Sequence, residues 1–205
     1  AGFLEVDPPY GINLPKVRMA SDKGELYSEY NEVAAVDYPE FLLRLTHECY
    51  RIASDNAWLI LWHGAEWYQP CINALQDAGF FTCPVPGIWK KGNAVGQSNS
   101  PDANLGLSYE QFIYARKGSP KLRLPGRSNV FDYPGVHPLH RIHRTERPVE
   151  LIRDILNTFV WPGTAVICPF AGSGNTLVAA AELHMPMAGF DLSEQFRNAF
   201  VARHT

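Results

Sequence analysis

The chain has 205 residues, 46% of them hydrophobic, and a formal net charge of −3 at pH 7. A chain of this length and apolar content can bury one full core, so we expect a single domain over residues 1–205. The slight negative charge excludes a general nucleic-acid coat protein, and no stretch is long and apolar enough to span a membrane. Four cysteines without paired CxxC spacing favour a reducing cytoplasm and argue against disulfides and a zinc site.

The first predicted element is a short strand, Phe3–Val6, which ends in Asp7-Pro8-Pro9-Tyr10. The two prolines fix two φ angles and remove two backbone donors, so nearby carbonyls stay free to accept hydrogen bonds. Asp7 adds a charged acceptor, and the Tyr10 ring can stack on a planar group. An exocyclic amine held by such acceptors has its lone pair turned toward an incoming electrophile. The tetrapeptide therefore indicates N-methylation, although an ordinary turn at a strand end is the common alternative.

Helices and strands alternate through the middle of the chain, as hydrophobic periodicity and breaker residues indicate. The predicted elements are a helix over 38–54, a buried strand over 58–62, a helix over 66–78, a strand region over 80–89, a strand around Phe112 and a helix over 148–159. Between them, 92–106 predicts a mobile loop that can close over a substrate, and 117–140 predicts an irregular segment. We assign Trp58, Trp62 and Trp67 to core packing.

Basic residues crowd the segment from Arg116 to Arg147, where only Asp132 and Glu146 oppose them. Such a stretch can neutralise phosphates, and a solvated loop is an equally good interpretation. Its position next to the first half of the chain favours DNA contact. The candidate contacts are Lys121, Arg123, Arg127, Arg141 and Arg144. The spacing of His137, His140 and His143 is a weak ligand pattern, so we expect no metal.

A glycine-rich turn near the C-terminus indicates a second site. The apolar strand candidate 164–167 is followed by Cys168-Pro169-Phe170-Ala171-Gly172-Ser173-Gly174-Asn175-Thr176 and a helix-like run over 177–184. The next strand, 187–190, ends in Asp191, about 20 residues beyond the glycines, where a carboxylate can bind ribose hydroxyls. The turn matches neither the P-loop nor G-x-G-x-x-G. An adenosine cofactor without a pyrophosphate fits it best, with a plain structural turn as the alternative.

The two sites together resemble those of the S-adenosylmethionine-dependent DNA amino-methyltransferases, which make N6-methyladenine or N4-methylcytosine. The tetrapeptide precedes the glycine turn, as in the β class of that family. The segment 143–152 is similar to the family's H-x-T-x-K-P-x-x-L-I sequence, and segments 87–93 and 108–113 resemble two of its strands. The resemblance therefore spans nearly the whole chain.

The resemblance implies an α/β doubly wound mixed sheet of the Rossmann-like methyltransferase type, which the alternation of elements also predicts. It implies S-adenosylmethionine as cofactor and DNA as partner, with a target base extruded from the duplex. Asp7, Pro8, Pro9 and Tyr10 would hold the amine, most readily N6 of adenine because the motif is DPPY rather than SPPY. The implied cofactor residues are Thr145, Pro148, Pro169, Phe170, Gly172, Ser173, Gly174 and Asp191.

The implied organisation is a catalytic half over about 1–117, a short recognition segment over about 118–142 and a cofactor half over about 143–205. The oligomeric state stays open, with a homodimer among the options. Three features depart from the family: Cys168 stands where an acid is usual, Asn175 replaces a usual Thr, and the chain opens directly on the DPPY strand. We take this opening as a sign of a trimmed sequence. The alternatives are an N4-cytosine methyltransferase, a protein or RNA methyltransferase, and a degenerate non-catalytic module that binds DNA or a partner.

Overall fold

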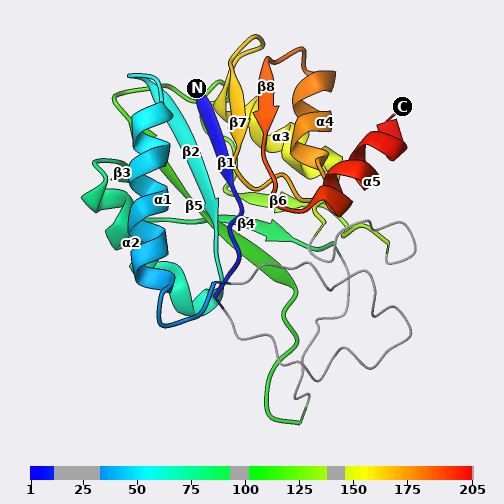
Figure 1. Cartoon of the computed structure of the whole chain (residues 1–205). Helices are drawn as coiled ribbons and strands as arrows, with labels where there is room; N and C mark the ends of the chain where they lie inside the picture. The colour runs from blue at the N-terminus through cyan, green and yellow to red at the C-terminus, as the bar shows by residue number, and fades with distance from the viewer. Residues whose placement is uncertain (12–32, 93–101, 138–145, 205) are drawn as a thin grey trace.

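A computed structural model describes residues 1–11, 33–92, 102–137 and 146–204. A mixed sheet crosses the middle of the molecule, with helices on both of its faces (Figure 1). In chain order the elements are β1 (Phe3–Val6), α1 (Tyr38–Ile52), β2 (Ala57–Trp62), the 3-10 helix η3 (Ala65–Trp67), α2 (Tyr68–Asp77), β3 (Phe81–Thr82), β4 (Gly87–Lys90), β5 (Tyr109–Lys117), β6 (Val130–Asp132), α3 (Val149–Phe159), β7 (Val166–Cys168), α4 (Asn175–Glu182), β8 (Met187–Gly189) and α5 (Glu194–His204).

The strand order is β6-β4-β5-β2-β1-β7-β8, and β3 pairs separately with β5. The neighbours β2, β1, β7 and β8 all run parallel, whereas β5 is antiparallel to β2, β3 and β4. Parallel strands need crossover connections, and the helices between them in the chain supply these. This arrangement confirms the predicted α/β doubly wound fold with a mixed sheet.

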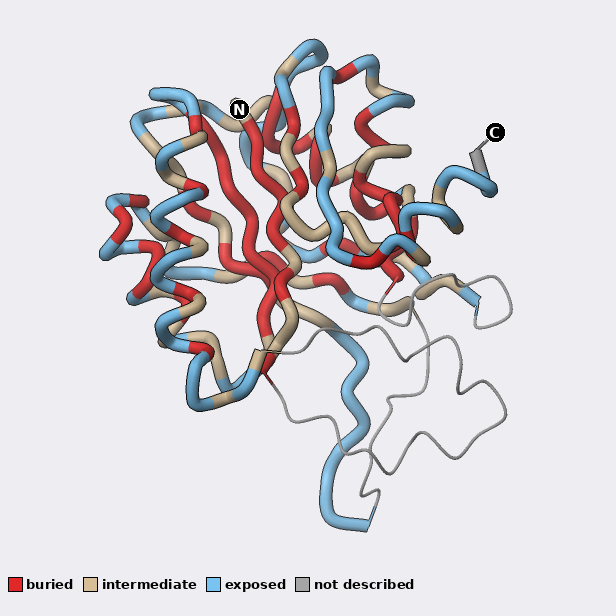
Figure 2. The backbone as a smooth tube through the Cα atoms, viewed as in Figure 1, coloured by how far each residue is buried: buried red, intermediate tan, exposed pale blue. Residues whose placement is uncertain are grey.

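Side chains of β1 alternate between two separate cores, because successive residues of a strand point to opposite faces of the sheet. Phe3 packs with residues of α3 and α4, whereas Leu4 and Val6 pack with residues of α1 and α2. Figure 2 shows β1 and β2 buried along their whole length at the centre of the molecule. The alternation places Glu5 on the same face as Phe3, toward α3 and α4.

The structure corrects the prediction that 117–140 is irregular, because β6 lies within this segment and pairs in parallel with β4. Three residues are too few to show a strand periodicity in sequence. The C-terminal helix α5 was also not predicted. Its residues are mostly polar, and they lack the apolar stripe that marks an amphipathic helix.

Several other predictions can be compared with the described residues. Trp58 and Trp62 are buried, as predicted, and Trp67 is partly buried against the α1–α2 core. Most of the loop predicted over 92–106 lies outside the described residues, as do His140 and His143. No helix in the described ranges has the length and apolar character needed to cross a bilayer. A cytoplasmic location and the division into two halves stay predictions.

Candidate active site

A pocket of about 480 Å³ lies at the carboxyl ends of the parallel strands. The helix after β1, α1, covers one face of the sheet, while α4, which follows β7, covers the other. The chain therefore leaves the neighbouring strands β1 and β7 in opposite directions, which is the point where open α/β sheets bind ligands. The volume is that of a site for a small organic molecule.

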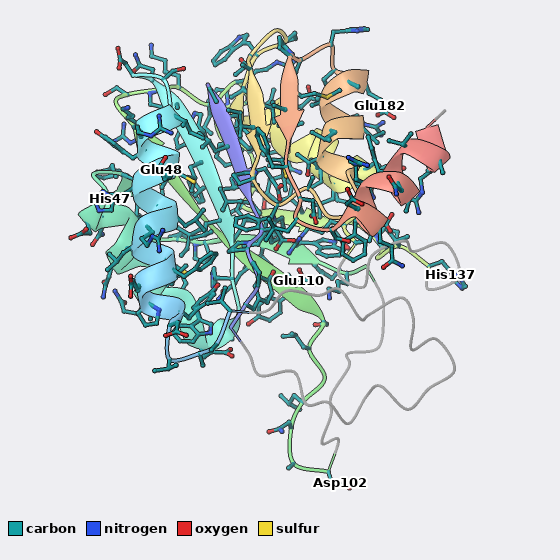
Figure 3. All side chains as sticks on the ribbon, viewed as in Figure 1. His47, Glu48, Asp102, Glu110, His137 and Glu182 are labelled. Carbon is teal, nitrogen blue, oxygen red and sulfur yellow. The ribbon has the colours of Figure 1, made fainter. Side chains whose placement is uncertain are left out.

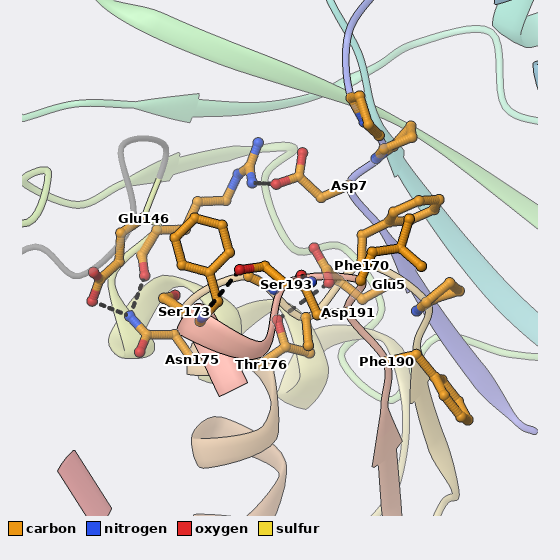
Figure 4. Close-up of a pocket in the computed structure, with 18 of the residues that line it drawn as sticks. Glu5, Asp7, Glu146, Phe170, Ser173, Asn175, Thr176, Phe190, Asp191 and Ser193 are labelled. Atoms are coloured by element: carbon orange, nitrogen blue, oxygen red, sulfur yellow. Dashed lines mark hydrogen bonds and ion pairs between the residues drawn. The ribbon is translucent and has the colours of Figure 1, made fainter. Parts of the chain in front are cut away.

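The pocket brings together the two motifs that lie at opposite ends of the chain. Its lining includes nine of the predicted site residues: Asp7, Pro8, Pro9, Tyr10, Pro169, Phe170, Gly172, Ser173 and Asp191. Two predicted cofactor residues do not line it: Pro148 is the N-cap of α3, and Gly174 is the N-cap of α4. Thr145 lies outside the described residues. Figure 4 shows Asp7 on one side of the pocket and the first residues of α4 on another.

Arg147 is one residue at this site that sequence reasoning missed. Its guanidinium forms an ion pair with Asp7, donates to the Tyr10 hydroxyl at 2.8 Å and to Glu110 at 3.0 Å, and lies 3.9 Å from the centroid of the Trp62 ring. Only 6% of its side chain is exposed. Arg147 stands at the position of the Lys in the H-x-T-x-K-P sequence, and this was the signal that could have identified it.

The charges in this cluster stabilise one another. Burial alone would lower the pKa of Arg147, but Asp7, Tyr10 and Glu110 together raise it well above its usual value. Burial would raise the pKa of Glu110, yet Arg147 and Lys91 lower it (Figure 3 labels Glu110). Burial and the nearby Asp7 raise the pKa of Tyr10 well above its usual value. At neutral pH the guanidinium is therefore charged and the Tyr10 hydroxyl stays protonated, donating to Asp7 at 3.1 Å.

Glu5 is a second residue that sequence reasoning did not assign to the site. It lines the pocket although only 3% of it is exposed. Trp62 donates to its Oε1 at 2.8 Å, while Cys168 and Thr176 donate to its Oε2 at 3.0 and 3.2 Å. Burial, followed by the charge of Asp7, raises the pKa of Glu5. The carboxylate thus lies next to the cysteine that replaces the family's usual acid.

Asp191 orders the turn that the sequence predicts to be the cofactor loop. Its Oδ2 accepts from the Gly172 N–H and its Oδ1 from the Ser193 N–H, both at 2.8 Å. Gly174 has φ +76°, and a Cβ there would lie 2.1 Å from the Phe200 ring, so this position requires glycine. The loop is therefore shaped by its own carboxylate and by close contact with α5.

Asn175, the second departure from the family, joins the cofactor loop to the Arg147 segment. Its Nδ2 donates to Glu146 at 3.0 Å and to the Arg147 carbonyl at 2.7 Å. Arg203 of α5 also donates to Glu146 at 2.8 Å. These contacts link the start of α4 to Arg147, the residue that holds Asp7, and the end of α5 to its neighbour Glu146.

None of the described residues of the predicted DNA-binding set lines the pocket. Arg123 donates to both the carbonyl and the side chain of Asn157 in α3, and Arg127 forms an ion pair with Asp154 of the same helix. Lys121 is exposed. Arg141 and Arg144 lie outside the described residues. DNA contact by these residues stays a prediction, and two of them already have protein partners.

The ionisable groups of the pocket favour a cationic ligand. The described lining contains the carboxylates of Glu5, Asp7, Glu146 and Asp191 but, among Lys and Arg, only Arg147. A pyrophosphate would meet this excess of negative charge, whereas a ligand that carries positive groups would be attracted by it. The pocket therefore suits an adenosine cofactor with cationic groups better than a dinucleotide.

Comparisons with known proteins bear on the family and the fold of the chain. The family model described as DNA methylase matches residues 3–202. The chain is 27% identical over 199 residues to the putative methylase YubD of Escherichia coli strain K12, covering 96% of this chain and 78% of that protein. Its fold is similar to the M1.HpyAVI–SAM complex, with a TM-score of 0.70, 16% identity and coverage of 98% and 87% of the two chains. It is also similar to the PvuII DNA methyltransferase, described as cytosine-N4-specific, with a TM-score of 0.76, 13% identity and coverage of 100% and 79%.

Proposed function

The chain belongs to the DNA methylase family, and from this premise we propose that it transfers a methyl group from S-adenosylmethionine to N6 of an extruded adenine in DNA. The observation that carries the proposal is the single pocket shared by Asp7-Pro8-Pro9-Tyr10, the glycine turn and Asp191. An acceptor for an amine and a site for an adenosine cofactor must face one cavity if a group is to pass between them.

The pocket residues fit S-adenosylmethionine. This cofactor carries an ammonium and a sulfonium, and its positive charge matches the surplus of carboxylates in the lining. Asp191 is the candidate acceptor for the ribose hydroxyls, because each of its oxygens keeps a free acceptor position beyond its backbone donor. Phe170 and the exposed Phe190 offer apolar surface for the adenine ring. When bound, the cofactor supplies an electrophilic methyl group.

The protein's own contribution is orientation. Asp7 accepts a hydrogen bond from the target amine, which turns the nitrogen lone pair away from the carboxylate and toward the methyl donor. Arg147 holds Asp7 in place and shares its charge, so Asp7 acts as an orienting acceptor rather than as a strong base. The amine nitrogen gains the methyl group as the bond between that carbon and the sulfonium sulfur breaks, with its electron pair left on a neutral thioether, and the nitrogen releases one proton to solvent.

The target base must leave the helical stack, since an exocyclic amine inside a duplex cannot reach a buried pocket. Tyr10 is the candidate stacking partner, with its ring oriented by the hydroxyl contacts to Asp7 and Arg147. The exposed Lys121 is the candidate phosphate contact outside the pocket. The preference for adenine follows the DPPY tendency alone, and N4 of cytosine presents the same kind of amine.

The test is nucleoside analysis by mass spectrometry after incubation with DNA and S-adenosylmethionine that carries a deuterated methyl group. We expect labelled N6-methyladenine, and none with the Asp7→Ala variant, which should still bind the cofactor. Labelled N4-methylcytosine would overturn the base assignment and keep the reaction type. Cofactor binding without transfer to any DNA would favour the non-catalytic alternative. Cys168, which replaces the family's usual acid, motivates that alternative, but the Glu5 carboxylate lies beside Cys168 and weakens this motive.

A further inference from the structure

Glu5 is a charged residue in the middle of a buried strand. Trp62, Cys168 and Thr176 each donate one hydrogen bond to its carboxylate. A carboxylate has about four acceptor positions, so roughly one remains, and it belongs to Oε1, which has a single donor. Glu5 belongs to the pocket lining, so a ligand in the pocket is the candidate donor for this remaining position.

This carboxylate has no cationic partner among the described residues. No ion pair in the described ranges includes it, and Arg147, whose charge acts on Glu5, forms its ion pairs with Asp7 and Glu110 instead. A buried carboxylate that lacks a cation is costly, and sequences retain such groups where a ligand supplies the opposite charge.

We propose that Glu5 binds the ammonium of the methionine portion of S-adenosylmethionine. In this role the carboxylate of Glu5 on β1 replaces the acid that the family usually has at position 168 on β7. The ammonium is preferred to the sulfonium because it carries N–H donors for the free acceptor position, whereas the sulfonium carries none. The proximity of the two positions supports this assignment, since Cys168 Sγ lies 3.0 Å from Glu5 Oε2. The inference rests on the proposed cofactor.

The placement has a consequence for stability. Burial and the charge of Asp7 raise the pKa of Glu5, while Arg147, Cys168 and Trp62 lower it to a smaller extent. A carboxyl whose pKa is higher in the folded than in the unfolded chain binds more protons when folded, so stability falls as pH rises from the unfolded toward the folded pKa. Above the pKa of Glu5 the free protein bears this cost, and the bound ammonium relieves it. Near and below that pKa part of the carboxyl is protonated, so cofactor binding there should release protons from Glu5.

The test is calorimetry on the wild-type chain and on Glu5→Gln with three ligands. S-adenosylmethionine has both cations, S-adenosylhomocysteine has the ammonium alone, and methylthioadenosine has neither. We expect Glu5→Gln to weaken the first two by about 10- to 100-fold and to leave the third unchanged, as loss of one charge-assisted hydrogen bond implies. Weakening of S-adenosylmethionine alone would reassign Glu5 to the sulfonium and overturn the ammonium assignment. Equal weakening of all three would show a structural role and overturn the proposal.

The melting temperature of the ligand-free Glu5→Gln variant distinguishes a ligand-binding role of Glu5 from a purely structural one. The Gln side chain can still accept from Trp62 and can donate to Cys168 and Thr176, so the ligand-free variant should melt about 2–4 °C higher than wild type at neutral pH. A lower melting temperature would contradict the idea that the charge is retained for a ligand. The matched control is Glu182→Gln on the exposed side of α4 (Figure 3), which should change neither affinity nor proton release.

Two further measurements do not depend on the single variant. Wild-type binding of S-adenosylmethionine, measured across a pH series in pairs of buffers of different ionisation enthalpy, should show proton release that grows toward the acid end, and methylthioadenosine should show none. In Glu5→Gln/Cys168→Asp the carboxylate returns to β7, and affinity for S-adenosylmethionine should recover at least in part. A folded double variant without recovery would overturn the equivalence of the two positions. If the wild-type chain binds none of the three ligands, the proposed cofactor itself is wrong.

Discussion

Arg147 holds the carboxylate of Asp7 in position through an ion pair. Asp7 and Arg147 are 140 residues apart in the sequence, and their ion pair is buried against the Trp62 ring. A buried pair of this kind contributes little net stability over an apolar pair, but removal of one partner leaves the other charge uncompensated. We therefore infer that the cluster orients Asp7, and that replacing any one of its charged members destabilises the protein.

The first prediction follows from this asymmetry. Arg147→Met should lower the free energy of unfolding by about 3–5 kcal/mol and abolish methyl transfer, because Asp7 loses its ion pair while Glu110 keeps only Lys91. Urea denaturation measures the loss. The matched control is Arg153→Met, whose partner Glu182 is 44% exposed, and it should lose at most about 1 kcal/mol. Similar small losses in both variants would contradict the role of the cluster.

Two variants of Tyr10 can separate the contribution of ring stacking to base binding from that of the hydroxyl's hydrogen bonds. Tyr10→Phe keeps the ring but removes the hydroxyl that joins Asp7 and Arg147, whereas Tyr10→Ala removes both. If the ring stacks on the base, the Phe variant should bind an oligonucleotide with an unpaired adenine nearly as well as wild type. The Ala variant should lose about 1–3 kcal/mol of binding free energy. Equal losses in a fluorescence titration would assign the role to the hydroxyl instead.

At the scale of elements, local patterns predicted what local forces determine. The buried strands β1 and β2 and the amphipathic helices α1 and α3 follow from apolar periodicity, and their predicted bounds agree within a few residues with the observed ones. β6 is different, because it exists only through its pairing with β4, whose paired residues lie 42 positions earlier. A pairing across the chain leaves no periodic signal in three residues, so this strand could not be predicted.

The loop between β7 and α4 depends on one carboxylate, and this gives the third prediction. Asp191→Ala should weaken S-adenosylmethionine binding by roughly 1.5–3 kcal/mol, because it removes a ribose acceptor and also the hydrogen bonds from the Gly172 and Ser193 N–H groups. Asp191→Asn keeps one oxygen and should lose less. Calorimetry on the two variants decides the question, and an unchanged affinity in Asp191→Ala would move the ribose contact to another residue.

At the scale of the whole molecule, the sequence predicted the motifs but not the residues that contact them in the fold. Residue type and spacing were enough to predict Asp7, the glycine turn and Asp191 as site residues. The fold brings them to one pocket. Glu5 carries no such signal, because it is a polar interruption of an apolar strand, and Arg147 is marked only by its place in the segment that resembles H-x-T-x-K-P, within a basic stretch. Their roles arise from contacts between distant segments, which only the folded chain displays.

The last prediction concerns that basic stretch. Arg127 forms an ion pair with Asp154 of α3 and lies over the Phe131 ring, so a DNA phosphate would have to displace a protein partner. Arg127→Met should therefore lower the free energy of unfolding by about 1–3 kcal/mol and leave the salt dependence of DNA binding unchanged. Lys121 is exposed, and Lys121→Met should reduce the slope of log K against log salt by about 0.9 without a loss of stability. DNA binding across a salt series, together with urea denaturation, distinguishes the two residues. A reduced slope in the Arg127 variant would show that phosphate displaces Asp154 in the complex.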